Sequence, residues 1–326
     1  MIAQLLALHP IVPYIVVVVA FVALIKGADI FVEGAASVAK KLGIPSVIIG
    51  LTIVAMGTSA PEAAVSITAA IDKSNGIALG NVVGSNLFNL LIVLGVCMLM
   101  TNLPTTKEII KRDYPWNLIA TAAVIVFIAD ANITRIEGII LLLMFAIYII
   151  YVVFKAIKNR EVSSEEVESL SWTKSIVFLV LGIVLIVVGG DAVVDSATVI
   201  AKSWGVSDML IGLTIVACGT SLPELVTSIV AAKKGECDMA IGNVVGSNMF
   251  NLLFILGMTT TITPIMNINL ADGILIDSVL LLGFTAMMYL FSIHGTKLQK
   301  AKGGISVVCY VVYLAYIILR AFGIAF

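Results

Sequence analysis

Two glutamates lie within apolar segments of this 326-residue sequence, and each ends a copy of the same short motif. Glu62 ends GTSAPE at 57–62, and Glu224 ends GTSLPE at 219–224. An ionised carboxylate inside an apolar segment is costly and by default marks a functional site. On a helix the hydroxyl residues three and four positions before each glutamate share its face. The predicted cation ligands of the two motifs are Thr58, Ser59, Glu62, Thr220, Ser221 and Glu224.

Each motif also contains a glycine and a proline that weaken a helical backbone, Gly57 and Pro61 in the first copy and Gly219 and Pro223 in the second. Pro61 has no N–H to donate, and its ring clashes with the carbonyl four residues earlier. We therefore expect carbonyls near Ala55, and near Ala217 in the second copy, to be free to turn toward a ligand. Irregular backbone inside a membrane is tolerated only where it lines a cavity or is buried in protein.

A stripe of amides and hydroxyls follows each motif at steps of four residues, and it has two interpretations. The stripes are Asn81, Ser85 and Asn89, and Asn243, Ser247 and Asn251. Polar residues on an apolar helix commonly form interhelical hydrogen bonds. Beside two carboxylates, ligation is favoured for Ser85, Asn89, Ser247 and Asn251, and a structural role for Asn81, Asn243, Asn86 and Asn248.

These ligand types select the ion. Carboxylate, hydroxyl, amide and carbonyl oxygens suit Ca²⁺, Na⁺ or Mg²⁺ rather than soft metals. Neither His9 nor His294 lies inside a predicted span, and the four cysteines are scattered, so a zinc or copper site is not expected. Two glutamates balance the charge of one Ca²⁺; without a cation they would repel each other and tend to take up protons. A site that must be loaded before it crosses the membrane is what an antiporter needs.

The composition indicates what positions these residues. The chain is 60% hydrophobic and only 12% charged, and its mean hydropathy is +1.14. Soluble domains have about 25% charged residues. Apolar runs of roughly 20 residues, long enough to cross a bilayer as helices, recur along the whole length. We predict an all-α polytopic membrane protein in a lipid bilayer; the net charge of −1 gives no support for nucleic-acid binding.

The apolar runs predict ten transmembrane helices. Their ranges are 12–37, 43–71, 77–100, 115–131, 136–157, 174–200, 205–233, 239–262, 272–293 and 303–325. A short linker at 158–173 separates a five-helix half at 1–157 from another at 174–326. Alternate connections carry 14 of the 19 lysines and arginines, so the positive-inside rule predicts that these are cytoplasmic and that both termini lie outside.

The two halves contain a sequence repeat. An offset of 162 residues aligns 43–95 with 205–257 without a gap, and about 31 of the 53 paired residues are identical. Because five spans is an odd number, the second copy must enter the membrane from the opposite side. Inverted repeats place the substrate site near the bilayer midplane, where the copies meet. The repeat therefore predicts a transporter.

At these motifs the sequence resembles the sodium/calcium exchanger family, within the cation/calcium antiporter superfamily. The duplicated GTSxPE and GNxxGSNxxN segments look like that family's two alpha-repeats, at 50–95 and 212–257. The resemblance implies that Glu62 and Glu224 are the central Ca²⁺ ligands, with Thr58 and Thr220 beside them. It also implies Na⁺ sites completed by Ser59, Ser221, Ser85, Ser247 and the carbonyls of Ala55 and Ala217. The first and sixth spans would slide to alternate access.

Two departures from the wider superfamily refine this expectation. Some relatives have Asp where this chain has Asn251, and in potassium-dependent members that Asp resembles a K⁺ determinant; Asn at 251 argues against K⁺ cotransport. The linker is also too short for the regulatory Ca²⁺-binding domains that animal members insert there, which is typical of a prokaryotic member. We expect a monomer that exchanges Ca²⁺ for Na⁺ across the cytoplasmic membrane without a cofactor.

Three alternatives remain. A H⁺/Ca²⁺ antiporter could use the same two carboxylates. A Ca²⁺ channel would also need intramembrane carboxylates, but channels usually arrange identical residues in rings around a symmetric pore. An intramembrane hydrolase is disfavoured, because Ser59 and Ser221 have no intramembrane His or Lys as a base.

Three further acidic residues are weaker candidates for the site. Asp29 and Asp191 are duplicated candidates for packing or gating, and Asp277 has no partner that the sequence reveals.

Overall fold

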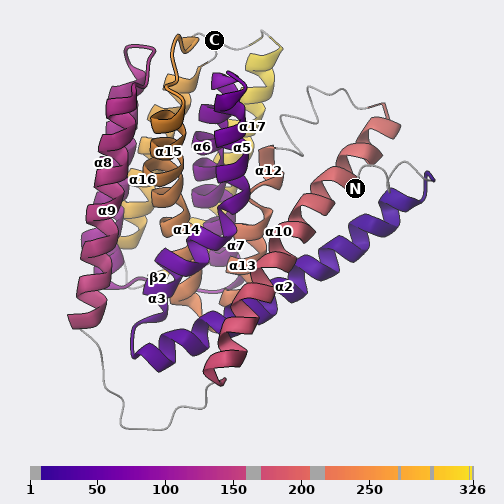
Figure 1. Cartoon of the computed structure of the whole chain (residues 1–326), viewed down its shortest axis with the longest axis vertical. Helices are drawn as coiled ribbons and strands as arrows, with labels where there is room; N and C mark the ends of the chain where they lie inside the picture. The colour runs from indigo at the N-terminus through magenta and orange to yellow at the C-terminus, as the bar shows by residue number, and fades with distance from the viewer. Residues whose placement is uncertain are drawn as a thin grey trace.

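The computed structural model describes residues 9–158, 170–205, 217–270, 273–293, 297–322 and 324, and the described chain is almost entirely helical (Figure 1). Before the predicted linker the helices are α2 (Val12–Leu42), α3 (Ser46–Ile49), η1 (Gly50–Val54), α4 (Ala55–Thr58), α5 (Ala60–Ile71), α6 (Asn75–Phe88), η2 (Asn89–Val93), α7 (Leu94–Met100), η3 (Ile109–Asp113), α8 (Tyr114–Ile128) and α9 (Arg135–Lys158). After it they are α10 (Trp172–Ser203), α12 (Ala217–Gly219), α13 (Leu222–Lys233), α14 (Cys237–Met249), η5 (Phe250–Ile255), α15 (Leu256–Ile262), α16 (Ile274–Ile293) and α17 (Lys300–Ala321).

The prediction of an apolar, all-helical membrane fold is confirmed, but the count of ten spans is not. Among the described residues, seven continuous helices are long and apolar enough to cross a membrane. The pair Ser46–Thr58 and Ala60–Ile71, bent by 48°, makes an eighth if it forms one span. The predicted span 115–131 corresponds to α8, which has only 15 residues. Residues 206–216 of the predicted span 205–233, and most of the linker, lie outside the described residues.

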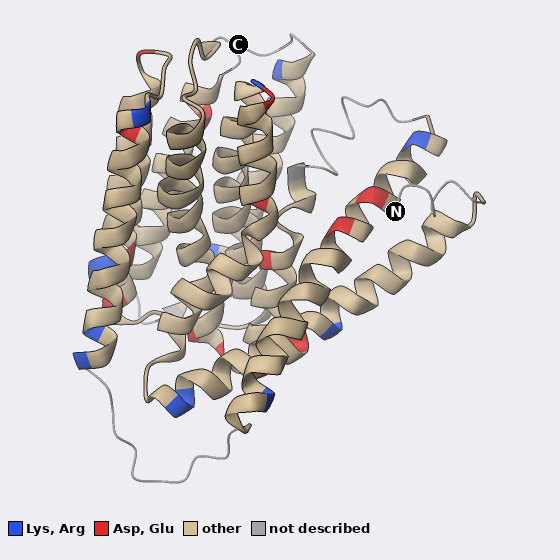
Figure 2. Cartoon of the chain, viewed as in Figure 1, with Lys and Arg blue, Asp and Glu red and all other residues tan. Residues whose placement is uncertain are grey.

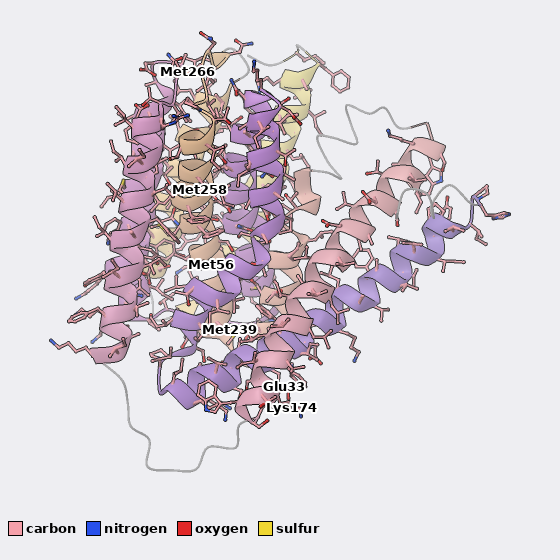
Figure 3. All side chains as sticks on the ribbon, viewed as in Figure 1. Glu33, Met56, Lys174, Met239, Met258 and Met266 are labelled. Atoms are coloured by element: carbon pink, nitrogen blue, oxygen red, sulfur yellow. The ribbon has the colours of Figure 1, made fainter. Side chains whose placement is uncertain are left out.

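The two longest helices, α2 and α10, run side by side and cross the remaining bundle obliquely (Figure 1). Glycines allow this close contact: a Cβ at Gly182 would lie 2.6 Å from Cβ of Phe31, and one at Gly27 would lie 2.7 Å from Cβ of Leu185. At the lower end of the pair, Glu33 of α2 and Lys174 of α10 lie near one another (Figure 3). Small residues that let two backbones approach are a common means of packing helices in membranes.

Within the described residues, three spans contain a π-helical turn in mid-course, and a further one, η3, precedes α8. η1 interrupts the helix that leads to Thr58, η2 lies between α6 and α7, and η5 lies between α14 and α15. η2 and η5 occupy corresponding places in the sequence repeat, since each includes the last asparagine of its polar stripe. π-Helical turns are rare and frequently lie at functional sites.

The helices α14 and α3–η1 make the closest packing near the middle of the bundle. A Cβ at Gly242 would lie 2.5 Å from the carbonyl oxygen of Val47, and one at Gly50 would lie 2.6 Å from that of Met239. Met239 lies on α14, and Met56 lies on α4, which continues η1 (Figure 3). The span Cys237–Ile262 is accordingly the most enclosed, with 94% of its apolar window buried in the protein.

Two short β contacts tie the connections at the two ends of the bundle. β1 (Leu103–Pro104) pairs antiparallel with β2 (Lys297–Leu298), and Ile133 forms an isolated bridge with Ile265. Lysines and arginines gather at the ends of the helices, most of them at the lower end in the view of Figure 2.

Candidate ion-binding site

Glu62 and Glu224 come together in the interior through reciprocal contacts between the two repeats. Both side chains are fully buried. The hydroxyl of Ser59 donates to Oε1 of Glu224 at 2.7 Å, and the hydroxyl of Ser221 donates to Oε1 of Glu62 at 3.0 Å. Each motif therefore contributes a carboxylate of its own and a hydroxyl to the carboxylate of the other motif. Residues that are about 160 positions apart in the sequence form one cluster.

The local backbone explains how each glutamate is placed. The helix before Ser59 ends there, and α5 begins with Pro61 in its first turn, where a missing N–H removes no helical hydrogen bond. Glu62 follows in the same first turn, where the positive end of the helix dipole stabilises an anion. Ser221, Pro223 and Glu224 repeat this arrangement at the start of α13. The two copies thus share the same local geometry, a helix break followed by a first helical turn that contains the glutamate.

The threonines cross between the repeats in the same way. Thr58 donates to Oδ1 of Asn243 at 3.2 Å, and Thr220 donates to Oδ1 of Asn81 at 3.4 Å. Asn81 in turn donates to the backbone carbonyl of Glu62 at 3.1 Å. Asn243 donates to that of Glu224 at 3.4 Å and to Ser228 at 2.9 Å. The two asparagines hold the helix that carries each glutamate, in keeping with the structural role expected for them.

The polar stripes complete the walls of the cluster. Ser247 donates to Oε1 of Glu224 at 3.4 Å, and Ser85 occupies the corresponding place in the first repeat. Several buried oxygens and nitrogens here have no hydrogen-bond partner in the described part of the chain. They are Oε2 of Glu62, Oε2 of Glu224, Oγ of Ser85, both amide atoms of Asn89 and Oδ1 of Asn251. Buried polar atoms are almost always paired, so this concentration of unpaired oxygens at two carboxylates is suited to a cation.

The amides at 86 and 248 were expected to be structural, and they form a contact that sequence reasoning missed. Asn86 donates to the carbonyl of Asn248 at 3.3 Å, and Asn248 donates to the carbonyl of Asn86 at 3.3 Å. Asn251 also donates to Oδ1 of Asn86 at 3.0 Å. The amide nitrogen of Asn251 is thereby fixed, which leaves its oxygen as the unpaired atom. The identical run at 80–86 and 242–248 was the available signal.

The expectation of a free carbonyl at Ala55 differs from the structure. The N–H of Ser59 donates to the Ala55 oxygen at 3.0 Å, because the helix continues up to the break at Ser59 rather than opening earlier. The hydroxyl of Thr58 also lies 3.4 Å from this oxygen, so both lone pairs of the Ala55 carbonyl have a donor nearby. Ala217 begins α12 at the border of the described residues, and its side chain lies outside them.

The motif glycines have a role that differs from loosening the helix. A Cβ at Gly57 would lie 2.9 Å from Cδ1 of Ile183, and one at Gly219 would collide with Val194. Both partners belong to α10. The glycines therefore bring the helices of the site into direct contact with the α2–α10 pair, which links the carboxylates to the elements expected to move.

Two of the remaining acidic candidates have partners outside the cluster. Arg320 binds Asp277 through two nitrogens, at 2.8 and 3.0 Å. Lys234 forms an ion pair with Asp29 at 2.9 Å. Neither aspartate joins the cluster, and within the described residues no group of three or more His, Cys, Asp and Glu side chains is placed to hold a metal. The candidate site thus consists of two carboxylates with hydroxyl and amide oxygens.

Comparison with known proteins places this architecture among cation exchangers. A family model described as "Sodium/calcium exchanger protein" matches residues 12–154 and 174–319. The sodium/calcium exchanger MaX1 of Methanosarcina acetivorans is 31% identical over 347 residues, which cover 92% of this chain and 97% of the relative. The inner membrane protein YrbG of Escherichia coli K12 is 35% identical over 259 residues, which cover 76% and 79%.

The fold is similar to a solved exchanger. The sodium-calcium exchanger NCX_Mj, soaked with 2.5 mM Na⁺ and 10 mM Sr²⁺, superposes with a TM-score of 0.83 at 30% identity. The similarity covers 94% of this chain and 99% of that one. The same exchanger soaked with 2.5 mM Na⁺ and 0.1 mM Ca²⁺ gives a TM-score of 0.82.

Proposed function

The chain belongs to the sodium/calcium exchanger family of cation/calcium antiporters, and from this premise we propose that it exchanges Ca²⁺ for Na⁺ across the cytoplasmic membrane by alternating access. The transported ions bind between the two repeats, near the bilayer midplane. Glu62 and Glu224 are the Ca²⁺ ligands, with Thr58 and Thr220 beside them. Ser59, Ser221, Ser85, Ser247, Asn89 and Asn251, with the carbonyls of Ala55 and Ala217, supply the other oxygens.

The reciprocal hydrogen bonds of Ser59 to Glu224 and of Ser221 to Glu62 carry this proposal. A site shared equally by two inverted copies can open to one side of the membrane and then to the other while its ligands stay together. The unpaired oxygens around the two carboxylates support cation binding. Hydroxyl and amide oxygens suit Na⁺ as well as Ca²⁺, because both are hard cations.

The α2–α10 pair is the moving element of the proposed cycle. Its two helices contact each other along their length. The glycines Gly57 and Gly219, which have no side chain, face α10 where the pair meets the helices of the site. Sliding of the pair past these glycines alternately covers each side of the carboxylates. In the proposed arrangement ten spans form two inverted five-helix repeats in a monomer, both termini lie outside, and no cofactor is needed.

A H⁺/Ca²⁺ antiporter is the second candidate. Two buried carboxylates in contact with neighbouring hydroxyls could exchange a divalent cation for protons. The clustered serine hydroxyls favour Na⁺, since a proton needs only the carboxylates.

The deciding experiment measures ⁴⁵Ca²⁺ uptake into proteoliposomes with Na⁺, H⁺ and K⁺ gradients imposed one at a time. We expect uptake with the Na⁺ gradient alone, and loss of that uptake in Glu62→Gln and Glu224→Gln. Uptake driven by the H⁺ gradient alone would favour the second candidate. Flux without any counter-ion would indicate a channel, and retained exchange in either glutamine variant would contradict the site.

A further inference from the structure

A basic pocket lies away from the ion site, between the start of α3, the segment before α8 and the end of α9. Its volume is about 450 Å³. We define it by the side chains that give its character: Lys107, Lys111, Arg112 and Lys155, with Glu108 as the single acid. The lysines come from two separate connections of the chain, which the fold brings to the same end of neighbouring spans. The pocket thus holds four cationic groups and one anionic group.

Three lysines of the pocket carry charge that no ion pair in the described part of the chain compensates. Lys107, Lys111 and Lys155 are exposed and form no ion pair with any described residue. Arg112 is different, because it is buried and donates to Asp113 through Nε at 2.6 Å and Nη2 at 2.9 Å. The guanidinium is therefore held in place and keeps Nη1 as a further donor. A fixed arginine surrounded by free lysines is well suited to a phosphate group.

The side of α9 next to the pocket is apolar and exposed. Ile147 is 57% exposed, Ile150 68% and Phe154 62%. Tyr151, at 40%, lines the pocket itself. In a membrane-spanning helix these side chains face acyl chains, and an aromatic residue with a polar tip is typical of the level of the headgroups. The charged pocket is thus continuous with a lipid-facing surface.

We propose that this pocket binds the phosphate headgroup of an anionic phospholipid, whose acyl chains lie along the exposed face of α9. Basic pockets between spans on the cytoplasmic side of a membrane are suited to such headgroups. A free phosphate ion would satisfy the same cations but would make no use of the apolar strip.

The bound lipid bridges parts of the fold that are connected to the ion site. Pro45 and Ile48 line the pocket opposite Lys155. Pro45 lies between the αL residue Gly43, which ends α2, and the start of α3. The same span continues through η1 to Thr58. A lipid held here would join α9 to the joint between the moving helix and the helix of the site. The binding itself does not depend on which counter-ion is exchanged.

The test is a titration of the purified full chain with phosphatidylglycerol, and separately with phosphatidylcholine, followed by native mass spectrometry. We expect tighter binding of phosphatidylglycerol, weakened on the order of a hundredfold in the variant Lys107→Gln/Lys111→Gln/Lys155→Gln, since each direct hydrogen bond to a charged phosphate contributes about tenfold or more. The variant Lys107→Arg/Lys111→Arg/Lys155→Arg keeps the charge and should keep the binding. The control Lys158→Gln/Lys233→Gln/Lys300→Gln removes the same charge from exposed positions outside the pocket and should change affinity only a few-fold.

Three outcomes would overturn the proposal. Equal weakening in the pocket variant and the control would show that general surface charge attracts the lipid. Equal affinity for phosphatidylglycerol and phosphatidylcholine would show that the negative charge of the headgroup does not determine binding. Full displacement of phosphatidylglycerol by inorganic phosphate at equal concentration would assign the pocket to a soluble anion. Thermal unfolding of each variant checks that the fold is retained.

Discussion

Ser59 donates a hydrogen bond to Glu224 at 2.7 Å, and so joins the helix break of one repeat to the carboxylate of the other. The partner of this contact in the second repeat is Ser221 on Glu62, at 3.0 Å. Both hydroxyls are buried. Because a hydroxyl can both donate to a carboxylate and offer a lone pair to a cation, each serine can serve the loaded and the unloaded site.

Removing either hydroxyl should weaken ion binding without abolishing it. In Ser59→Ala or Ser221→Ala the loaded site loses one hydroxyl oxygen as a ligand, and we expect roughly a tenfold loss of affinity from the loss of one polar contact to a charged group. If the serines are Na⁺ ligands, the half-maximal Na⁺ concentration for ⁴⁵Ca²⁺ exchange should rise more than that for Ca²⁺. Ser203→Ala, at the exposed end of α10, is the control. An unchanged half-maximal Na⁺ concentration in both variants would show that the serines are not Na⁺ ligands.

Substitution of a motif glycine should slow transport more than it weakens binding. A Cβ at Gly57 would lie 2.9 Å from Cδ1 of Ile183 and 3.4 Å from Phe31, so Gly57→Ala adds a methyl group where the site helix meets α10 and α2. We expect Ca²⁺ binding within a few-fold of the unmodified protein and a turnover reduced at least tenfold. Equilibrium ⁴⁵Ca²⁺ binding and initial uptake rates separate the two effects. If both fall together, the glycine supports the site rather than the movement.

The contact between Gly50 and Gly242 should determine stability. A Cβ at Gly50 would lie 2.6 Å from the backbone oxygen of Met239 and 3.1 Å from Cα of Gly242, and backbone atoms cannot move aside cheaply. Gly50→Ala should therefore cost about 1–3 kcal/mol by overpacking. Gly283→Ala, in α16, has no atom within 4 Å of the added Cβ and should be neutral or stabilise the helix by up to about 1 kcal/mol. Thermal unfolding in one detergent compares them. An equal effect at both glycines would contradict the packing argument.

The sequence predicted the class of fold and the composition of the candidate site because both are periodic signals. Apolar runs predicted the helices, and the 162-residue offset predicted that Glu62 and Glu224 would approach each other. The structure brings together these two carboxylates, both motif serines and Ser247. It could not be foreseen from the offset alone that Ser59 would contact the opposite glutamate rather than its own, since that depends on how the two broken helices cross.

Contacts between residues far apart in the sequence could not be predicted from the sequence. Gly57 was interpreted as weakening its helix, but its closest constraint is Ile183 of α10, more than a hundred residues away. The π-helical turns could not be predicted, because no residue type in them is specific to a π-helix: η2 and η5 each combine one asparagine with apolar residues that also form ordinary spans. Asp277 had no visible partner, since Arg320 lies 43 residues further along the chain and only the tertiary structure brings the two side chains together.

Asp277 of α16 and Arg320 of α17 form an ion pair through two hydrogen bonds. The carboxylate accepts from Nη2 at 2.8 Å and from Nη1 at 3.0 Å, and the two side chains are 9% and 18% exposed. Removing one partner of such a pair leaves the other charge unpaired in a poorly solvated place, at a cost of roughly 3 kcal/mol. We therefore expect Asp277→Asn and Arg320→Gln each to lower the thermal unfolding midpoint clearly.

The double variant Asp277→Asn/Arg320→Gln should lose less than the sum of the two single variants, because it leaves no uncompensated charge. A double-mutant cycle on thermal unfolding measures this coupling directly. Strict additivity would show that the pair contributes no interaction energy. Asp277 and Arg320 line a cavity together with Ser85 and Thr220, but neither is hydrogen-bonded to a glutamate of the cluster. We therefore expect the half-maximal Ca²⁺ concentration of the double variant to stay unchanged, which distinguishes a structural ion pair from a third carboxylate that takes part in ion binding.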